Sequence, residues 1–183
     1  LHHMSSTEYL NYETGKFSKS KGIGVFGSDA RDSGIPADMW RFYIFYNRPE
    51  KADTLFTWKD FQDRVNSELI GNLGNLVNRT CTFVSRYYEG RIPAADGFNS
   101  TRDDIRSKIA DLRDAAANSF AKITELLEWA ELRDAFKEVF ALSSIANKAF
   151  QDGEPWKNRT VDPEFAEALI RELCYLIKDL MIL

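Results

Sequence analysis

Residues 57–90 read TWKDFQDRVNSELIGNLGNLVNRTCTFVSRYYEG, and this stretch decides the fold class. Thr57 can cap the N-terminus of a helix, and Asp60 follows in the first turn, where its charge complements the helix dipole. The spacing of the apolar residues predicts one long amphipathic helix that ends near Gly90. Its apolar side consists of Phe61, Val65, Leu69, Leu73, Leu76 and Val84.

Helical patterns continue to the end of the chain. Apolar residues at helical spacing predict a helix over 100–127, another over 132–150 and a last one from residue 162 onward. The last helix starts with Asp162 as its cap and Pro163 in the first helical position. Long amphipathic helices joined by short connections bury their apolar sides well in an antiparallel bundle. We therefore predict a mainly α protein built on an antiparallel helical bundle.

A short strand and loop region precedes the bundle. The stretch 9–12 has the alternation of a strand, and Glu13-Thr14-Gly15 has the composition of a turn. A short helix is predicted from Ala37 to about Asn47. Strands are therefore expected only within the first ~35 residues.

The composition limits the classes of function. The chain has 183 residues, 44% hydrophobic and 28% charged, as expected of a folded domain with one core. No apolar stretch is long enough to span a bilayer, so no membrane partner is predicted. The net charge of −4 argues against indiscriminate binding of DNA or RNA, because that mode needs many cations. We predict no DNA partner, whereas an RNA-binding protein with a local basic patch stays open.

Residues 1–4, Leu1-His2-His3-Met4, resemble the end of a purification tag and are set aside. Because both histidines lie there, the rest of the chain lacks the commonest metal ligand, and no metal site is predicted. Cys81 and Cys174 lie far apart in helical patterns and are predicted to be buried, reduced thiols. Reduced thiols indicate a reducing compartment, so we expect a cytoplasmic protein.

Three lysines, Lys16, Lys19 and Lys21, alternate with Ser18 and Ser20 in a short glycine-flanked stretch that predicts an exposed, mobile loop. Lysine ammonium groups suit the oxygens of a triphosphate, whose leaving pyrophosphate gains charge in the transition state. A lysine-rich turn that contacts only solvent has the same composition. Charge alone leaves both interpretations open.

Two further features suit RNA. Asn75 and Arg79 are four residues apart on the long helix, so they point the same way and could hydrogen-bond the edges of unstacked bases. Pro155-Trp156 follows a predicted helix end and is flanked by cations such as Lys148 and Arg159. A tryptophan held on such a turn offers a face for base stacking, worth ~1–3 kcal/mol per base. For Asn75 and Arg79, the alternative interpretation is a polar pair on the helix surface that contacts only water. The other tryptophans are predicted to pack in or near the core: Trp40, Trp58 and Trp129.

Lys16-Phe17-Ser18-Lys19-Ser20 resembles the Lys-Met-Ser-Lys-Ser signature of class I aminoacyl-tRNA synthetases, with phenylalanine in place of methionine. Residues 34–43, GIPADMWRFY, and 66–79, NSELIGNLGNLVNR, are similar to methionyl-tRNA synthetases in order and spacing. The similarity covers nearly all of the chain from about Glu8 and is loosest over residues 94–130. The chain thus resembles the C-terminal part of a methionyl-tRNA synthetase.

In that family the signature loop closes over ATP while methionine is activated. The resemblance implies catalytic roles for Lys16 and Lys19 and ATP contacts from Lys16, Ser18, Lys19 and Ser20. It implies ATP and Mg as cofactors of the full-length enzyme, with none bound tightly to this chain. The sequence contains no His-Ile-Gly-His-type stretch, the mark of the nucleotide-binding domain, so we expect no methionine activation by this chain alone.

The same family recognises a CAU anticodon with an Asn-Leu-x-x-Arg segment and a later Pro-Trp. The stretches 75–79 and 146–156 match these two motifs. The resemblance implies tRNA(Met), through its anticodon stem-loop, as the partner, with ATP and methionine bound only when the catalytic domain is present. The implied anticodon-binding residues are Asn75, Arg79, Asn147, Pro155 and Trp156.

The resemblance also divides the chain. Residues 5–33 correspond to the strand and signature loop at the end of the catalytic domain, 34–56 to a connective segment that contacts the tRNA stem, and 57–183 to the helical anticodon-binding domain. One rival is a synthetase for another hydrophobic amino acid, which the Asn75, Arg79 and Trp156 matches disfavour. The other is a helical protein-interaction module of the same fold without RNA binding, which an acidic or apolar surface at the expected basic groove would favour.

Overall fold

The computed structural model describes residues 4, 6–13 and 15–182. Residues 1–3 of the expected tag remnant lie outside the described residues, as does Thr14 of the predicted turn. The chain divides into two compact units. The first unit comprises Leu1–Gly71 and Thr124–Lys137, and the second comprises Asn72–Ile123 and Glu138–Leu183. The family-based limits near residues 33 and 56 stay predictions.

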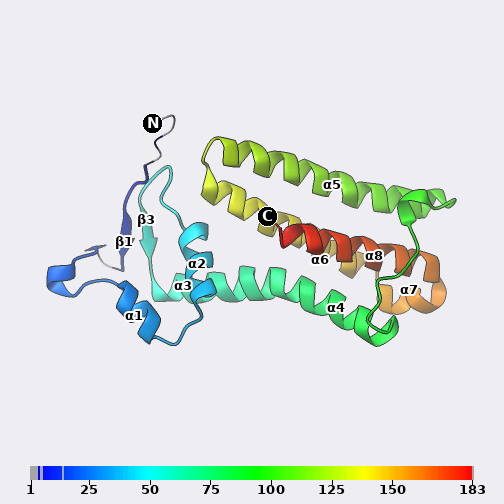
Figure 1. Ribbon diagram of the computed structural model, residues 1–183, viewed down its shortest axis with the longest axis horizontal. Coiled ribbons are helices and arrows are strands. Elements are labelled where there is room, and N and C mark those ends of the chain that lie inside the picture. Colours follow the sequence, from blue (N-terminus) through cyan, green and yellow to red (C-terminus); the bar gives the residue numbers. More distant parts are fainter. Residues whose placement is uncertain (1–3, 5, 14, 183) are drawn as a thin grey trace. The chain divides into compact units, whose positions relative to one another are not determined.

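The first unit contains a three-stranded sheet (Figure 1). Strand β1 (Leu10–Tyr12) pairs antiparallel with β2 (Gly15–Lys16), which confirms the predicted strand. On its other side β1 pairs in parallel with β3 (Thr54–Phe56). The prediction that strands end by about residue 35 is therefore wrong. Three residues are too few to show alternation, and the hydrogen bonds of β3 come from a distant strand.

Three short helices belong to the first unit: α1 (Gly27–Asp32), α2 (Ala37–Tyr46) and α3 (Trp58–Arg64). Helix α2 confirms the predicted helix. Helix α1 falls where we expected loop, and the carboxylate of Asp29 accepts a hydrogen bond from the Phe26 amide at its start (2.9 Å). The predicted cap of α3 is confirmed, because Thr57 accepts a hydrogen bond from the Asp60 amide (3.0 Å).

Aromatic rings fill the core of the first unit. Tyr43 is buried, and its hydroxyl donates to Asp60 over 2.8 Å. Burial and this carboxylate raise the pKa of Tyr43. Trp40 packs on Phe61, with ring centroids 4.7 Å apart, as predicted. The prediction is wrong for Trp129, which is 75% exposed because it lies just past the end of a helix, where no element covers it.

The long predicted helix is continuous, but its middle has π-helical geometry. Helix α3 leads into η2 (Val65–Gly74), which has i→i+5 hydrogen bonding, and then into α4 (Asn75–Tyr87). Gly71 fits this geometry, since a Cβ there would lie 2.8 Å from the carbonyl oxygen of Asn66. Apolar spacing does not distinguish a π-helical stretch from an α-helix, so this feature was not predicted.

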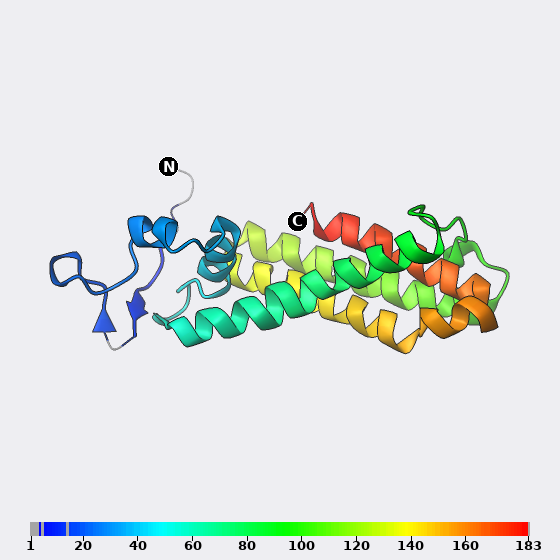
Figure 2. The same ribbon diagram turned by 90° about the horizontal axis from the view of Figure 1, so that it is seen from below.

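The second unit contains the bundle. After a short 3-10 turn η3 (Gly97–Asn99) come α5 (Asp103–Glu128), α6 (Leu132–Asp152), α7 (Pro155–Val161) and α8 (Pro163–Leu180). Helices α4, α5, α6 and α8 lie side by side in the part that belongs to this unit (Figure 2). The mainly α, antiparallel bundle is therefore confirmed. Its least exposed side chains include Leu76, Ile105, Ile109, Leu142, Ile170 and Leu173.

None of the described helices is long and apolar enough to cross a membrane.

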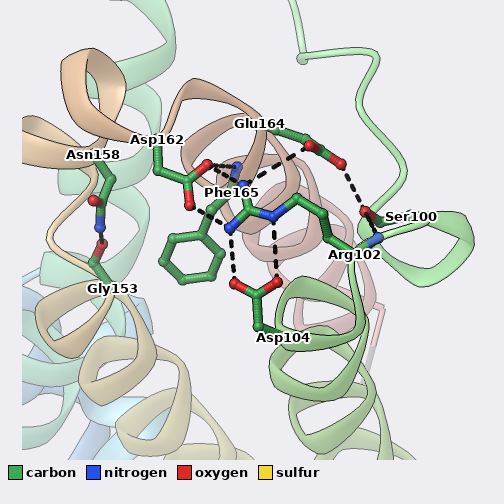
Figure 3. A network of polar contacts seen from close by, with 8 residues as sticks. All are labelled: Ser100, Arg102, Asp104, Gly153, Asn158, Asp162, Glu164 and Phe165. Atoms are coloured by element: carbon green, nitrogen blue, oxygen red, sulfur yellow. Dashed lines mark hydrogen bonds and ion pairs between the residues drawn. The ribbon is translucent and has the colours of Figure 1, made fainter.

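A polar network joins the start of α5 to the junction of α7 and α8 (Figure 3). Arg102 donates to both oxygens of Asp162 (2.6 and 2.8 Å) and also pairs with Asp104 (2.8 Å). Asp162 in turn accepts a hydrogen bond from the Phe165 amide, which confirms it as the cap of α8. The contact with Arg102 lowers the pKa of Asp162.

Replacing Asp162 by asparagine should keep a capping side chain but remove the ion pair with Arg102. Because the folded-state pKa of Asp162 is lowered, the pair stabilises the fold above the ordinary aspartate pKa, and its contribution is lost as the pH falls through the lowered value. We expect urea unfolding, followed by circular dichroism, to show an earlier midpoint for Asp162→Asn at neutral pH and no difference in strong acid. Asp162→Ala should lose ~1 kcal/mol more with the cap. A difference that does not change with pH would contradict this role.

Both cysteines are free, as predicted, but only one is shielded from solvent. Cys81 is exposed, against our prediction, because its position on α4 faces away from the bundle core. Cys174 is half-buried, and burial raises its pKa to about 11. At pH 8 a thiol with that pKa is about one part in a thousand thiolate, the reactive form.

We therefore expect one fast and one slow thiol when the folded protein reacts with a disulfide reagent at pH 8. Cys81→Ser should remove the fast phase, and Cys174→Ser should leave it unchanged. Retention of the fast phase in Cys81→Ser would refute the assignment.

Candidate functional site

The lysine-rich loop is a small, closed turn in the first unit. Ser18 and Ile23 exchange two backbone hydrogen bonds (2.8 and 3.0 Å), and Lys19–Lys21 form a 3-10 turn between them. Gly22 ends this turn with a positive φ of 62°, which glycine adopts without strain. These hydrogen bonds fix the backbone of the turn, and with it the positions from which the side chains of residues 19–21 extend.

Phe17 holds the base of the loop. Its ring packs on Tyr12 (5.4 Å between centroids) and on Phe26 (6.4 Å). Gly24 has a φ of 133°, and a Cβ there would lie 2.2 Å from a carbon of the Phe17 ring. The phenylalanine that replaces the methionine of the signature is thus accommodated by a glycine that leaves room for it.

The polar groups of the loop face solvent. Lys19, Ser20 and Lys21 are exposed, and Ser18 is half-buried with its Oγ 3.4 Å from that of Ser20. The Lys16 ammonium lies 5.1 Å from the centre of the Tyr9 ring. Of the predicted ATP-contacting residues, Ser18, Lys19 and Ser20 therefore lie in or next to this turn, whereas Lys16 lies in β2. The described residues include no group of three or more His, Cys, Asp or Glu side chains that could hold a metal.

In the second unit, α4 presents an amide and a guanidinium one helical turn apart, and each has a hydrogen-bond partner on α6. The Asn75 Nδ2 donates to the Oδ1 of Asn147 (3.1 Å), and the Arg79 Nη2 donates to the Oε1 of Gln151 (2.9 Å). Asn75 and Arg79 are half-buried. The spacing prediction for this pair is met, and each side chain has a fixed partner on α6.

Arg79 also begins an aromatic ladder. Its guanidinium lies 4.3 Å from the centre of the Phe150 ring, and that ring lies 6.1 Å from Trp156 at an angle of 33°. Phe83 packs edge-on against Phe150, with ring centroids 6.1 Å apart. A cation and two rings thus lie in sequence across α4, α6 and α7.

Trp156 lies in the first turn of the short helix α7. The prediction of an irregular turn at this position is therefore wrong. Pro155 is buried and takes the first helical position, where its missing N–H leaves no hydrogen bond unmade. Gly153 allows the chain to pass closely, since a Cβ there would lie 2.2 Å from Leu169. Trp156 remains 38% exposed, so part of its ring is open to a ligand.

Asn147, predicted to contact the anticodon, has its amide engaged with protein groups. Its Nδ2 donates to the carbonyl of Asn72 (2.9 Å), its Oδ1 accepts from Asn75, and its side chain is only half-buried. It supports the surface from behind.

Sequence reasoning did not single out three members of this surface: Tyr87, Phe150 and Gln151. The Arg159 guanidinium lies 4.3 Å from the centre of the Tyr87 ring, and that of Arg86 lies 5.3 Å away. Helical spacing assigned Phe150 to the core, and only the fold shows that its ring also supports Arg79. Tyr87 and Gln151 contact residues on other helices. The sequence next to each of them therefore does not indicate these contacts.

The exposed side chains of this region include several cations and the carboxylate of Asp152. Lys148, Lys157 and Arg159 are exposed, and Lys157 pairs with Glu154 at 2.6 Å. We name the surface formed by the residues discussed above the α4–α7 surface. Its members are Asn75, Arg79, Arg86, Tyr87, Lys148, Phe150, Gln151, Trp156 and Arg159.

Sequence comparison gives the class of the protein. A family model described as tRNA synthetases class I (M) matches residues 1–81. The methionine–tRNA ligase of Treponema denticola is 75% identical over all 183 residues, that of Treponema pallidum 62%, and that of Borreliella burgdorferi 48%. Each match covers 100% of this chain and 23% of the relative, so the chain spans about a quarter of these relatives' length.

Solved structures share the fold. The free form of Mycobacterium tuberculosis methionyl-tRNA synthetase matches with a TM-score of 0.76 at 18% identity, covering 94% of this chain and 32% of that one. The complex of the same protein with methionyl-adenylate matches at 0.79 and 21% identity, covering 94% and 33%.

The chain is therefore similar over residues 1–81 to the class I aminoacyl-tRNA synthetases, in agreement with its signature stretch. Within that class, the relatives that match the chain over its whole length are methionine–tRNA ligases.

Proposed function

We propose that this chain is the part of a methionine–tRNA ligase that binds the anticodon stem-loop of tRNA(Met) and recognises its CAU anticodon. The observation that carries the proposal is the ladder of Arg79, Phe150 and partly exposed Trp156 beside Asn75. It combines a stacking face with polar groups for base edges, the two features that single-stranded RNA recognition uses.

Recognition begins with base stacking on the open part of Trp156. The buried Pro155 and the close contact at Gly153 fix this ring, so little rotamer freedom is lost on binding. Asn75 and Arg79 then hydrogen-bond the edges of unstacked bases. A guanidinium held by Gln151 and Phe150 is already oriented for this contact. Each good base contact is worth ~1–3 kcal/mol.

The remaining cations of the α4–α7 surface suit the RNA backbone. Arg159 and Arg86 lie by Tyr87, and Lys148 is exposed on α6. Contacts with phosphates position a nucleic acid without selecting a sequence. These residues therefore add affinity that falls with salt, whereas selectivity rests on Trp156 and its neighbours.

The loop at residues 16–21 serves methionine activation in the full-length enzyme. Lys19, with Lys16 in support, stabilises the charge that grows on the pyrophosphate leaving ATP, and Ser18 and Ser20 offer hydrogen bonds to its oxygens. Lysines on a turn cannot align ATP and methionine without a pocket, so this chain alone is inactive in that step. Residues 34–56 link the loop to the bundle and contact the tRNA stem. Such work on tRNA belongs in the cytoplasm.

Fluorescence titration of this chain with a CAU stem-loop tests the anticodon proposal. Wild type should bind the CAU loop about tenfold or more tightly than a loop with an altered anticodon, and Trp156→Ala should remove that preference. Arg159→Ala should weaken the binding of both stem-loops about equally, because the Arg159 guanidinium is proposed to contact a phosphate and not a base. Equal binding of both loops by a folded wild type would contradict the proposal. It would favour a protein-interaction module of the same fold.

The loop proposal needs the full-length enzyme. Lys19→Ala should slow ATP–pyrophosphate exchange by about 100-fold or more while the affinity for methionine changes little, because the contact forms in the transition state. Lys21→Ala lies on the same turn outside the matched signature and provides the control. An equal loss in both variants would show that the loop acts only through its general charge.

A further inference from the structure

Asn72 is a buried polar side chain behind the α4–α7 surface. It lies in the π-helical stretch η2 and is only 9% exposed. A buried amide needs partners for both its donor and its acceptor. The hydrogen bonds of Asn72 lead to Asn147, and those of Asn147 lead to Asn75. The three amides form a relay from the interior to the surface.

A backbone carbonyl determines which end of the Asn72 amide donates and which accepts in the relay. The Asn72 Nδ2 donates to the carbonyl oxygen of Phe140 (2.8 Å) and to the Oγ of Ser144 (2.8 Å). A carbonyl oxygen can only accept, so the amino group of Asn72 must face this side. Its Oδ1 is then directed toward Asn147.

The second amide is fixed in the same way. One atom of the Asn147 amide faces the carbonyl oxygens of Asn72 (2.9 Å) and Ser143 (3.2 Å) and the Oδ1 of Asn72 (3.2 Å). Three acceptors require a donor, so this atom is Nδ2. The Oδ1 of Asn147 consequently faces Asn75.

Asn75 must therefore turn its own Nδ2 inward, where it donates to Asn147 over 3.1 Å. The reverse orientation would set two carbonyl oxygens against each other. Among the described residues, no hydrogen bond is made to the Oδ1 of Asn75. The half-buried side chain thus offers an acceptor to a ligand.

We propose that Asn72 and Asn147 are positioning residues that set the polarity of the Asn75 amide, so that Asn75 accepts a hydrogen bond from an amino or imino group of an anticodon base. The inference rests on the proposed function, in which Asn75 contacts a base. It changes the role of Asn147 from a base contact to an orienting one. It adds Asn72, which is almost fully buried.

Side-chain amide NMR on the free protein tests the relay without RNA. Asn147→Ala should shift the Asn75 side-chain amide signals and speed their exchange with water, because one N–H loses its acceptor. Asn72→Ser should do so more weakly through Asn147. Asn99→Ala removes an amide that hydrogen-bonds Asp96 in the same unit and should leave Asn75 unchanged. Unchanged Asn75 signals in a folded Asn147→Ala protein would overturn the relay.

A double-mutant cycle tests the consequence for RNA. Asn147→Ala should weaken CAU stem-loop binding about tenfold, and should have no further effect in an Asn75→Ala background. Additive losses would show that Asn147 contacts RNA itself and would overturn the positioning role. If Asn72→Ser does not fold, the Asn147 cycle decides alone.

Base analogues that lack an amino or imino donor test the direction of the bond. One such replacement in the CAU loop should weaken its binding to the wild-type protein about tenfold and should change its binding to Asn75→Ala little. If none does, the acceptor role is wrong. If wild type binds no CAU loop at all, the proposed function fails, and the NMR result still decides whether the relay orients Asn75.

Discussion

Burial of α8 is the constraint on which the second unit depends. Ala166, Ile170 and Leu173 on this helix have no exposed surface. Truncating one such leucine typically costs ~2–5 kcal/mol, a large share of the ~5–15 kcal/mol that stabilise a domain. Because α8 packs on both α4 and α7, the contacts that stabilise the unit also hold the helices of Asn75 and Trp156 in place.

Polar contacts add to the effect of this core in two different ways. The ion pairs around Arg102 are partly exposed, and such pairs usually add little stability because water screens them. The amide of Asn72 is buried, where an unmet hydrogen bond is expensive and an orientation is therefore strongly favoured. The network at Arg102 guides how α5 meets α8, whereas the buried amide determines the direction of its neighbours.

Local signals predicted most of the fold. The caps Thr57 and Asp162 and the apolar spacing located the long helices, because these features act within one turn of the chain. Strand β3 and the exposure of Trp129 depend on what lies nearby in space, and the sequence around them carries no trace of it. The π-helical stretch escaped prediction for a related reason. Its apolar residues follow a spacing that an α-helix also satisfies.

The candidate site was predictable where it depends on spacing along one helix, as for Asn75 and Arg79. The partners of both come from α6, and no spacing rule pairs residues so distant in the chain. Asn147 illustrates the limit, since it matches the motif by residue type and position, whereas its hydrogen bonds are with protein groups. An amide can select a donor or an acceptor equally well, and only the carbonyls behind it decide which atom faces out. Selectivity at such a surface would therefore be a property of the buried layer as much as of the residues that we propose to contact RNA.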